Sequence, residues 1–86
     1  MASYSIEISG TAEKQLKKLP KDDQQRVATA ITALGLDPYP QRSRKLTGYD
    51  DVFRIRIGRY RVLYSVSAQK LLIIILKIGH RKDVYR

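Results

Sequence analysis

The sequence predicts an α+β domain in which an N-terminal helical hairpin packs on one face of an antiparallel sheet. An alternating segment near the N-terminus is typical of a strand, two helical patterns follow it, and three apolar segments separated by turns occupy the second half of the chain. The expected sheet therefore combines the N-terminal strand with a C-terminal three-stranded meander. A chain of 86 residues can build one modest core, so residues 1–86 are expected to form a single domain.

The first half of the chain carries the strand and the two helices. Apolar and polar residues alternate over positions 3–8, which indicates a half-buried strand. Ser9 or Thr11 is a suitable N-cap for a first helix, and Pro20 ends that helix. The second helix has two aspartates in its first turn, where they suit the helix dipole, and Gly35 is its expected stop. Its apolar stripe consists of Val27, Ala30, Ile31 and Leu34.

The second half of the chain carries the meander. A proline-containing loop over residues 36–43 precedes it, and strands are expected over residues 52–57, 60–66 and 71–78. The last of these is apolar at nearly every position. Such a strand is expected in the centre of a sheet, covered on both faces, whereas the two before it alternate and should leave one face open.

The positive charge is confined to the second half of the chain. Residues 1–41 hold five basic and five acidic residues, whereas residues 42–86 hold twelve basic and three acidic ones, so the net charge of +9 belongs entirely to the second half. A field directed from one half of a small protein predicts an anionic partner. A solvated basic face without a specific ligand is the alternative.

Three arginines of the meander are expected to converge. If Gly58 and Arg59 form a two-residue hairpin turn, then Arg54, Arg56 and Arg61 share the sheet face opposite the apolar residues. Like charges directly across a strand pair destabilise it by roughly 0.2–1 kcal/mol, and an anion would relieve that repulsion. The planar fork of arginine suits phosphate oxygens, so the cluster predicts phosphodiester binding. Arginine stems that merely cover apolar sheet surface are the competing interpretation.

Three further polar residues follow the last strand directly. They are expected to lie at the edge of the sheet face that carries the three arginines. These residues are His80, Arg81 and Tyr85. Successive residues of an extended strand face opposite sides, so His80 and Arg81 are not expected to point the same way.

Several of these segments occur together in a known group of proteins. They are Lys-Leu-Thr-Gly at 45–48, Phe-Arg-Ile-Arg-Ile at 53–57, Tyr-Arg-Val-Leu-Tyr at 60–64, Gly-His-Arg at 79–81, and Tyr85. On these segments the chain resembles the RelE/ParE superfamily of bacterial and archaeal toxins, and within it the RelE-like ribonucleases. The resemblance covers nearly the whole chain.

The resemblance implies a toxin of a type II toxin-antitoxin system. Such a toxin is a metal-independent endoribonuclease that cleaves mRNA in the ribosomal A site, through attack of the 2′-hydroxyl on the adjacent phosphate. It implies a cognate antitoxin that forms a hetero-oligomer with the toxin, mRNA and the ribosome as further partners, and no cofactor or metal.

The resemblance also implies roles for individual residues. Arg61 stabilises the phosphate during cleavage, Arg81 assists the leaving oxygen and Tyr85 serves as the base. Because arginine hardly releases a proton whereas histidine titrates near neutral pH, His80 is an alternative acid, and the choice stays open. The phosphate-binding and RNA-binding set consists of Arg54, Arg56, Arg61 and Lys45.

Other functions remain as alternatives. A ParE-like toxin would inhibit DNA gyrase without catalysis, and a plain nucleic-acid-binding module would bind without cutting. A membrane-surface role ranks last, because neither helix carries a broad apolar face beyond what the core needs. The chain has no Cys and one His, which excludes a disulfide frame, a thiol nucleophile and a thiolate or histidine-rich metal site. No apolar run is long enough to span a bilayer and no signal peptide is recognisable, so we expect a cytoplasmic protein with no membrane partner.

Overall fold

The computed structural model describes residues 3–80 of the chain. Over this range the chain forms two helices and five strands. The helices are α1 (Gly10–Lys17) and α2 (Lys21–Leu34). The strands are β1 (Ser5–Ile8), β2 (Ser43–Lys45), β3 (Val52–Ile57), β4 (Tyr60–Ser67) and β5 (Leu72–His80).

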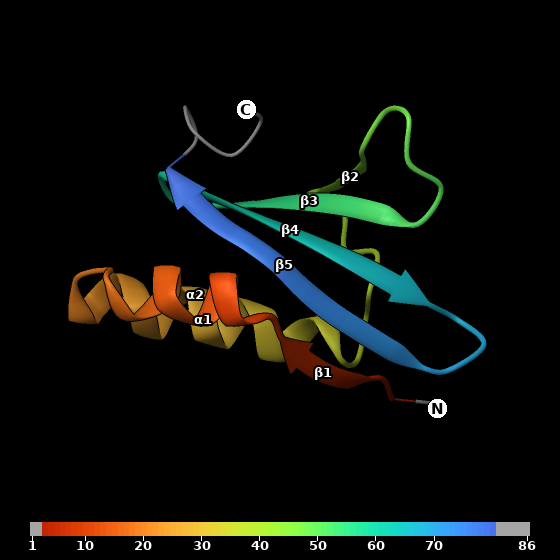
Figure 1. Cartoon of the computed structure of the whole chain (residues 1–86), viewed down its shortest axis with the longest axis horizontal. Helices are drawn as coiled ribbons and strands as arrows, with labels where there is room; N and C mark the ends of the chain where they lie inside the picture. The colour runs from red at the N-terminus through yellow and green to blue at the C-terminus, as the bar shows by residue number, and fades with distance from the viewer. Residues whose placement is uncertain (1–2, 81–86) are drawn as a thin grey trace.

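The strands form one sheet in the order β1-β5-β4-β3-β2, with both helices on one of its faces (Figure 1). The predicted α+β class and the helical hairpin are therefore confirmed. The sheet is mixed, however, because β1 pairs parallel with β5 while the other neighbours are antiparallel. Alternation along a strand reveals which side is buried but not which way the strand runs, so the sequence could not predict this direction.

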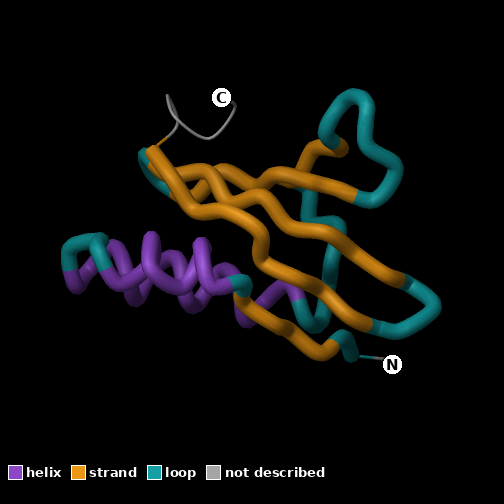
Figure 2. The backbone as a smooth tube through the Cα atoms, in the orientation of Figure 1, coloured by secondary structure: helices purple, strands orange, loops and turns teal. Residues whose placement is uncertain are grey.

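The strand β2 is absent from the sequence prediction. It comprises only Ser43–Lys45 and pairs with β3 at the edge of the sheet. Three consecutive polar residues show no alternation, so nothing in their pattern separates them from the preceding loop. In Figure 2 the strand is a short orange segment between two teal loops. Short, charged edge strands of this kind discourage pairing with other chains.

The helix boundaries follow local signals that the sequence displays. The Ser9 hydroxyl accepts a hydrogen bond from the Ala12 N–H at 3.1 Å, so Ser9 is the N-cap of α1 as predicted. Pro20 directly precedes α2, whose first turn carries two aspartates, and Gly35 directly follows it. In the folded domain α1 contacts β5 and α2 contacts β3.

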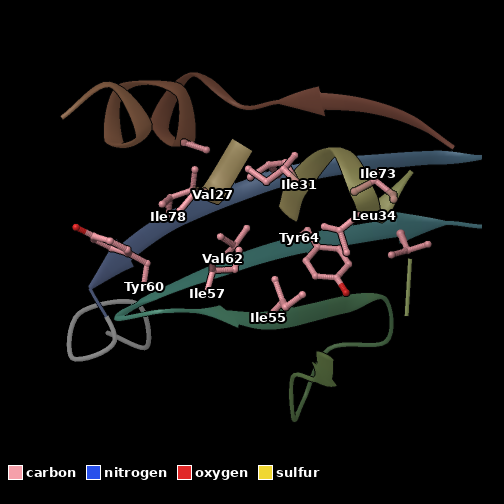
Figure 3. Close-up of a cluster of buried hydrophobic side chains, with 13 residues drawn as sticks. Val27, Ile31, Leu34, Ile55, Ile57, Tyr60, Val62, Tyr64, Ile73 and Ile78 are labelled. Atoms are coloured by element: carbon pink, nitrogen blue, oxygen red, sulfur yellow. The ribbon is translucent and has the colours of Figure 1, made fainter. Parts of the chain in front are cut away.

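The core lies between the helices and the sheet. It combines the apolar stripe of α2 with alternate residues of β3, β4 and β5 (Figure 3). Ala30 of the predicted stripe is half-buried at its margin. The buried cluster consists of Ala12, Val27, Ile31, Leu34, Ile55, Ile57, Tyr60, Val62, Tyr64, Val66, Ile73, Ile75 and Ile78.

A bulge interrupts β5 at Leu76. The pairing register between β4 and β5 shifts there, so Leu76 has no opposite residue. Helix α1 provides polar partners beside this irregularity. The Ser9 hydroxyl donates to the Leu76 carbonyl at 3.0 Å, and the Ile78 N–H donates to Gln15 Oε1 at 2.7 Å. The bulge is therefore stabilised by side chains from another element, because unpaired backbone groups in a partly buried place are costly.

The bulge decides which way the end of β5 faces. Beyond it, Ile78 pairs with Val62 and His80 pairs with Tyr60, so both lie on the helix-covered side of the sheet. Lys77 lies on the opposite side, opposite Leu63. A regular strand would reverse these faces, since one extra residue exchanges the two sides.

Candidate functional site

Arginines of three strands share the sheet face that the helices leave uncovered. Arg56 lies directly opposite Arg61 in the β3–β4 pair, and Arg44 lies directly opposite Arg54 in the β2–β3 pair. The predicted register and the predicted common face of the three meander arginines are confirmed. Arg44 joins them through the unpredicted strand.

A tight turn produces this register. Ile57 pairs with Tyr60, so Gly58 and Arg59 form a two-residue connection as expected. Gly58 has φ of +60°, which glycine adopts without strain, whereas Arg59 does not have a positive φ. Glycine in the first position is typical of a type II′ turn, which suits the twist of the two strands.

The arginine face is hollowed into a cleft of about 490 Å³. Within residues 3–80, no acidic side chain belongs to its lining. Arg54 and Arg61 are half-buried, whereas the other arginines of the lining are exposed. The cleft therefore concentrates positive charge in a concave surface, the arrangement that raises the local concentration of anions. We call it the arginine cleft, and its lining consists of Arg42, Arg44, Arg54, Arg56, Gly58 and Arg61.

Lys45, predicted to bind RNA, does not line the arginine cleft. It lies opposite Phe53, whose ring packs at the margin of the core, so Lys45 belongs to the other face of the sheet. It lines a second hollow, of about 410 Å³, in the loop between β2 and β3. Strand β2 thus separates Arg44 and Lys45 onto opposite faces.

His80 also lies apart from the arginines, on the other face of the sheet. It pairs with Tyr60 on the helix side, and the two rings meet edge to face with their centroids 6.0 Å apart. Arg61, next to Tyr60 in the chain, faces the opposite side of the sheet. Arg81 and Tyr85 lie outside the described residues, so their placement remains a prediction.

A polar contact that the sequence did not predict joins α2 to the start of β4. The Tyr60 hydroxyl donates to Asp23 Oδ2 at 2.8 Å, and this hydrogen bond is the main reason why the pKa of Tyr60 is raised, with burial adding to it. Arg26 lies one helical turn along, 4.0 Å from Asp23. The Asp23 carboxylate therefore anchors the turn end of the β3–β4 hairpin, next to Arg61.

Residues 3–80 show neither a metal site nor a membrane-spanning helix. This part of the chain contains no group of three or more His, Cys, Asp or Glu side chains placed to hold a metal ion. Neither of its helices combines the length and the apolar character that crossing a bilayer requires.

Known proteins are similar to this chain in fold and in sequence. The family model described as the ParE toxin of type II toxin-antitoxin systems matches residues 6–85. The chain belongs to the RelE/ParE superfamily of toxins. This match, together with the RelE-named relatives described next, confirms the predicted family, and the protein is a RelE-family toxin of a toxin-antitoxin system.

Relatives of this RelE/ParE toxin occur in archaea and bacteria. A relative from Methanocaldococcus jannaschii that carries the name RelE1 is 35% identical, over 96% of each chain. The toxin RelG of Mycobacterium tuberculosis is 34% identical, over 96% of this chain and 97% of its own length. In the crystal structure of the archaeal RelE-RelB complex from Pyrococcus horikoshii, a matching chain is 33% identical, with 95% of this chain and 99% of that one covered and a TM-score of 0.84.

Proposed function

We propose that this toxin is a metal-independent endoribonuclease that cleaves mRNA in the ribosomal A site. The observation that carries the proposal is the arginine cleft, in which guanidinium groups from three strands converge on one concave surface. Arginines gathered on one concave surface offer forked donors that suit phosphate oxygens and attract a polyanion. The relatives named RelE toxins support a site for RNA over a plain basic surface.

The reaction uses the substrate's own 2′-hydroxyl as nucleophile. The 2′-oxygen forms a bond to phosphorus while the bond from phosphorus to the 5′-oxygen breaks, which gives a 2′,3′-cyclic phosphate and a 5′-hydroxyl. A base takes the 2′ proton, the 5′-oxygen gains one, and negative charge grows on the non-bridging oxygens. No metal-activated water is needed, because the nucleophile is part of the RNA.

Arg54, Arg56 and Arg61 supply the charge stabilisation in this mechanism. Arg61 is half-buried, so its interaction with a phosphate oxygen is screened less than that of a fully exposed arginine. By resemblance, Tyr85 takes the 2′ proton and Arg81 clamps the leaving oxygen. His80 faces the other side of the sheet and is therefore a weaker candidate for the acid.

The partners follow from the same proposal. The Pyrococcus horikoshii relative was crystallised as a RelE-RelB complex, which supports a cognate antitoxin and a hetero-oligomer for this chain as well. An acidic antitoxin segment would neutralise the arginine cleft and exclude RNA from it. The ribosome would supply the mRNA in a cleavable geometry, which places the toxin in the cytoplasm.

One observation favours a second candidate, inhibition of DNA gyrase. The matching family model carries the ParE name, and a ParE-like gyrase inhibitor would need no catalytic groups. The arginine cleft favours the ribonuclease, because a gyrase inhibitor does no chemistry on a phosphodiester and has no need of guanidinium groups gathered at one site.

Primer-extension mapping of transcripts after induced expression distinguishes the two candidates. The ribonuclease predicts discrete breaks within translated codons, which disappear in Arg61→Ala and Tyr85→Phe. Intact transcripts, together with failure of gyrase supercoiling in the presence of the toxin, would instead establish the second candidate.

A further inference from the structure

The arginine cleft extends beyond the residues that the resemblance assigns to phosphate binding. Its lining also includes Arg42 and Arg44. Arg42 lies just before the edge strand β2, and Arg44 lies within that strand. A phosphodiester presents only two non-bridging oxygens, and the three arginines of β3 and β4 suffice to contact both of them. The two arginines at the β2 edge therefore exceed what a single scissile phosphate requires.

Local hydrogen bonds fix the position of Arg44. Its Nη1 donates to the carbonyls of Gln41 and Ser43, at 3.1 and 3.0 Å. These bonds use only one end of the guanidinium, and Nη2 and Nε retain their donors for an anion. An arginine held in this way loses little conformational freedom on binding.

A closed turn carries Arg42. The Ser43 N–H and the Ser43 hydroxyl both donate to the Pro40 carbonyl at 2.8 Å, which closes a four-residue turn with Arg42 at its third position. Arg42 and Arg44 thus line the β2 end of the cleft. Both lie on a short backbone segment that hydrogen bonds hold in place.

We propose that Arg42 and Arg44 form a second phosphate subsite, which holds a phosphate next to the scissile one on the same RNA strand. This subsite rests on the proposed ribonuclease function and extends it to a substrate with at least two consecutive phosphates. Arg44 lies directly opposite Arg54, so the strand would continue from β3 towards the edge of the sheet. An RNA strand fits better than an acidic protein segment, because the lining consists of arginines and one glycine and offers no apolar pocket for an anchoring side chain.

Binding of oligonucleotides of two lengths tests the subsite. The probes are a 2′-O-methyl dinucleotide with one phosphate and a 2′-O-methyl tetranucleotide with three, neither of which can be cleaved. Fluorescence anisotropy compares the wild type with Arg42→Gln/Arg44→Gln, with Arg56→Gln, and with a charge-matched control. The control is Lys17→Gln/Lys18→Gln, at two exposed positions where α1 ends.

The subsite predicts that the wild type, the control and Arg56→Gln each bind the tetranucleotide at least about fivefold more tightly than the dinucleotide, a gain expected when an additional phosphate is bound. The Arg42→Gln/Arg44→Gln variant should keep the dinucleotide affinity and lose that gain. Its log-log salt slope for the tetranucleotide should fall by about 0.7 for each phosphate that the variant no longer neutralises.

Four results would count against these assignments, and they separate the two proposals. A wild type that gains nothing from the additional phosphates overturns the subsite. A double variant that keeps the gain overturns it too, while weaker binding by Arg56→Gln leaves the ribonuclease site in place. If Arg56→Gln binds the dinucleotide with the same affinity as the wild type, that result contradicts the ribonuclease site itself. A double variant that keeps the gain but no longer binds a polyglutamate peptide assigns the two arginines to an acidic protein surface and overturns the subsite.

Discussion

Tyr60 donates a hydrogen bond to Asp23 over 2.8 Å and so joins the first residue of β4 to the first turn of α2. Tyr60 is the neighbour of Arg61 in the chain and lies opposite His80 in the sheet. Figure 3 shows its ring at one end of the buried cluster, with the hydroxyl directed away from that cluster. This contact joins the helical layer to β4, the strand that carries Arg61.

The Tyr60–Asp23 hydrogen bond predicts a loss of stability in alkali. It raises the pKa of Tyr60 above the ordinary tyrosine value of 10.0, so its contribution is complete below that pH and disappears as the pH rises through the raised pKa. We expect Tyr60→Phe to lower the urea midpoint at pH 8 and to differ less from the wild type at pH 11.

Tyr49→Phe is the control for that experiment, because Tyr49 is 59% exposed. It should match the wild type at both pH values. A Tyr60→Phe deficit of equal size at pH 8 and pH 11 would contradict the role given to the hydrogen bond.

Gln15 supports the bulge of β5, and its removal should destabilise the fold. In Gln15→Ala the partly buried Ile78 N–H has no side-chain acceptor, so we expect the free energy of unfolding to fall by about 1–3 kcal/mol. Urea unfolding at pH 7 measures this decrease. Gln25→Ala, at an exposed position of α2, is the matched control and should stay within about 0.5 kcal/mol of the wild type. Equal decreases in the two variants would show that Gln15 does not stabilise the bulge.

The sequence predicted those elements in which the spacing of apolar and polar side chains shows which face is buried. The helices, the β3–β4 hairpin and the common face of Arg56 and Arg61 follow from apolar spacing and from Gly58. Strand β2 was missed because an exposed edge strand needs no apolar side. No pattern in the sequence therefore indicated that Arg44 lies opposite Arg54 or belongs to the site.

The end of β5 shows a different limit. The bulge at Leu76 depends on Ser9 and Gln15, which are distant in the chain, and no pattern within an almost continuously apolar strand reveals it. That bulge places His80 beside Tyr60 and away from the arginine cleft. A prediction from local alternation alone could not settle which face His80 occupies.

Arg56 is expected to contribute to cleavage while slightly lowering the stability of the fold. Arg56→Gln removes one of two opposed positive charges, so the free energy of unfolding should stay equal or rise by about 0.2–1 kcal/mol. Cleavage of ribosome-bound mRNA should nevertheless fall. Arg59→Gln, on the exposed turn of the same hairpin and outside the cleft lining, should leave cleavage unchanged. A variant at Arg56 that loses both stability and cleavage would indicate a structural role instead.

The most direct test of the ribonuclease site is the single-turnover rate at which purified toxin cleaves ribosome-bound mRNA. Arg61→Ala should reduce that rate by about 100-fold or more, the usual effect of removing one donor that stabilises charge in a transition state. Its circular dichroism spectrum should remain that of the wild type, and Lys70→Ala, at an exposed turn, should cleave normally. A folded Arg61→Ala protein that cleaves at the wild-type rate would contradict the assignment of the arginine cleft to the scissile phosphate.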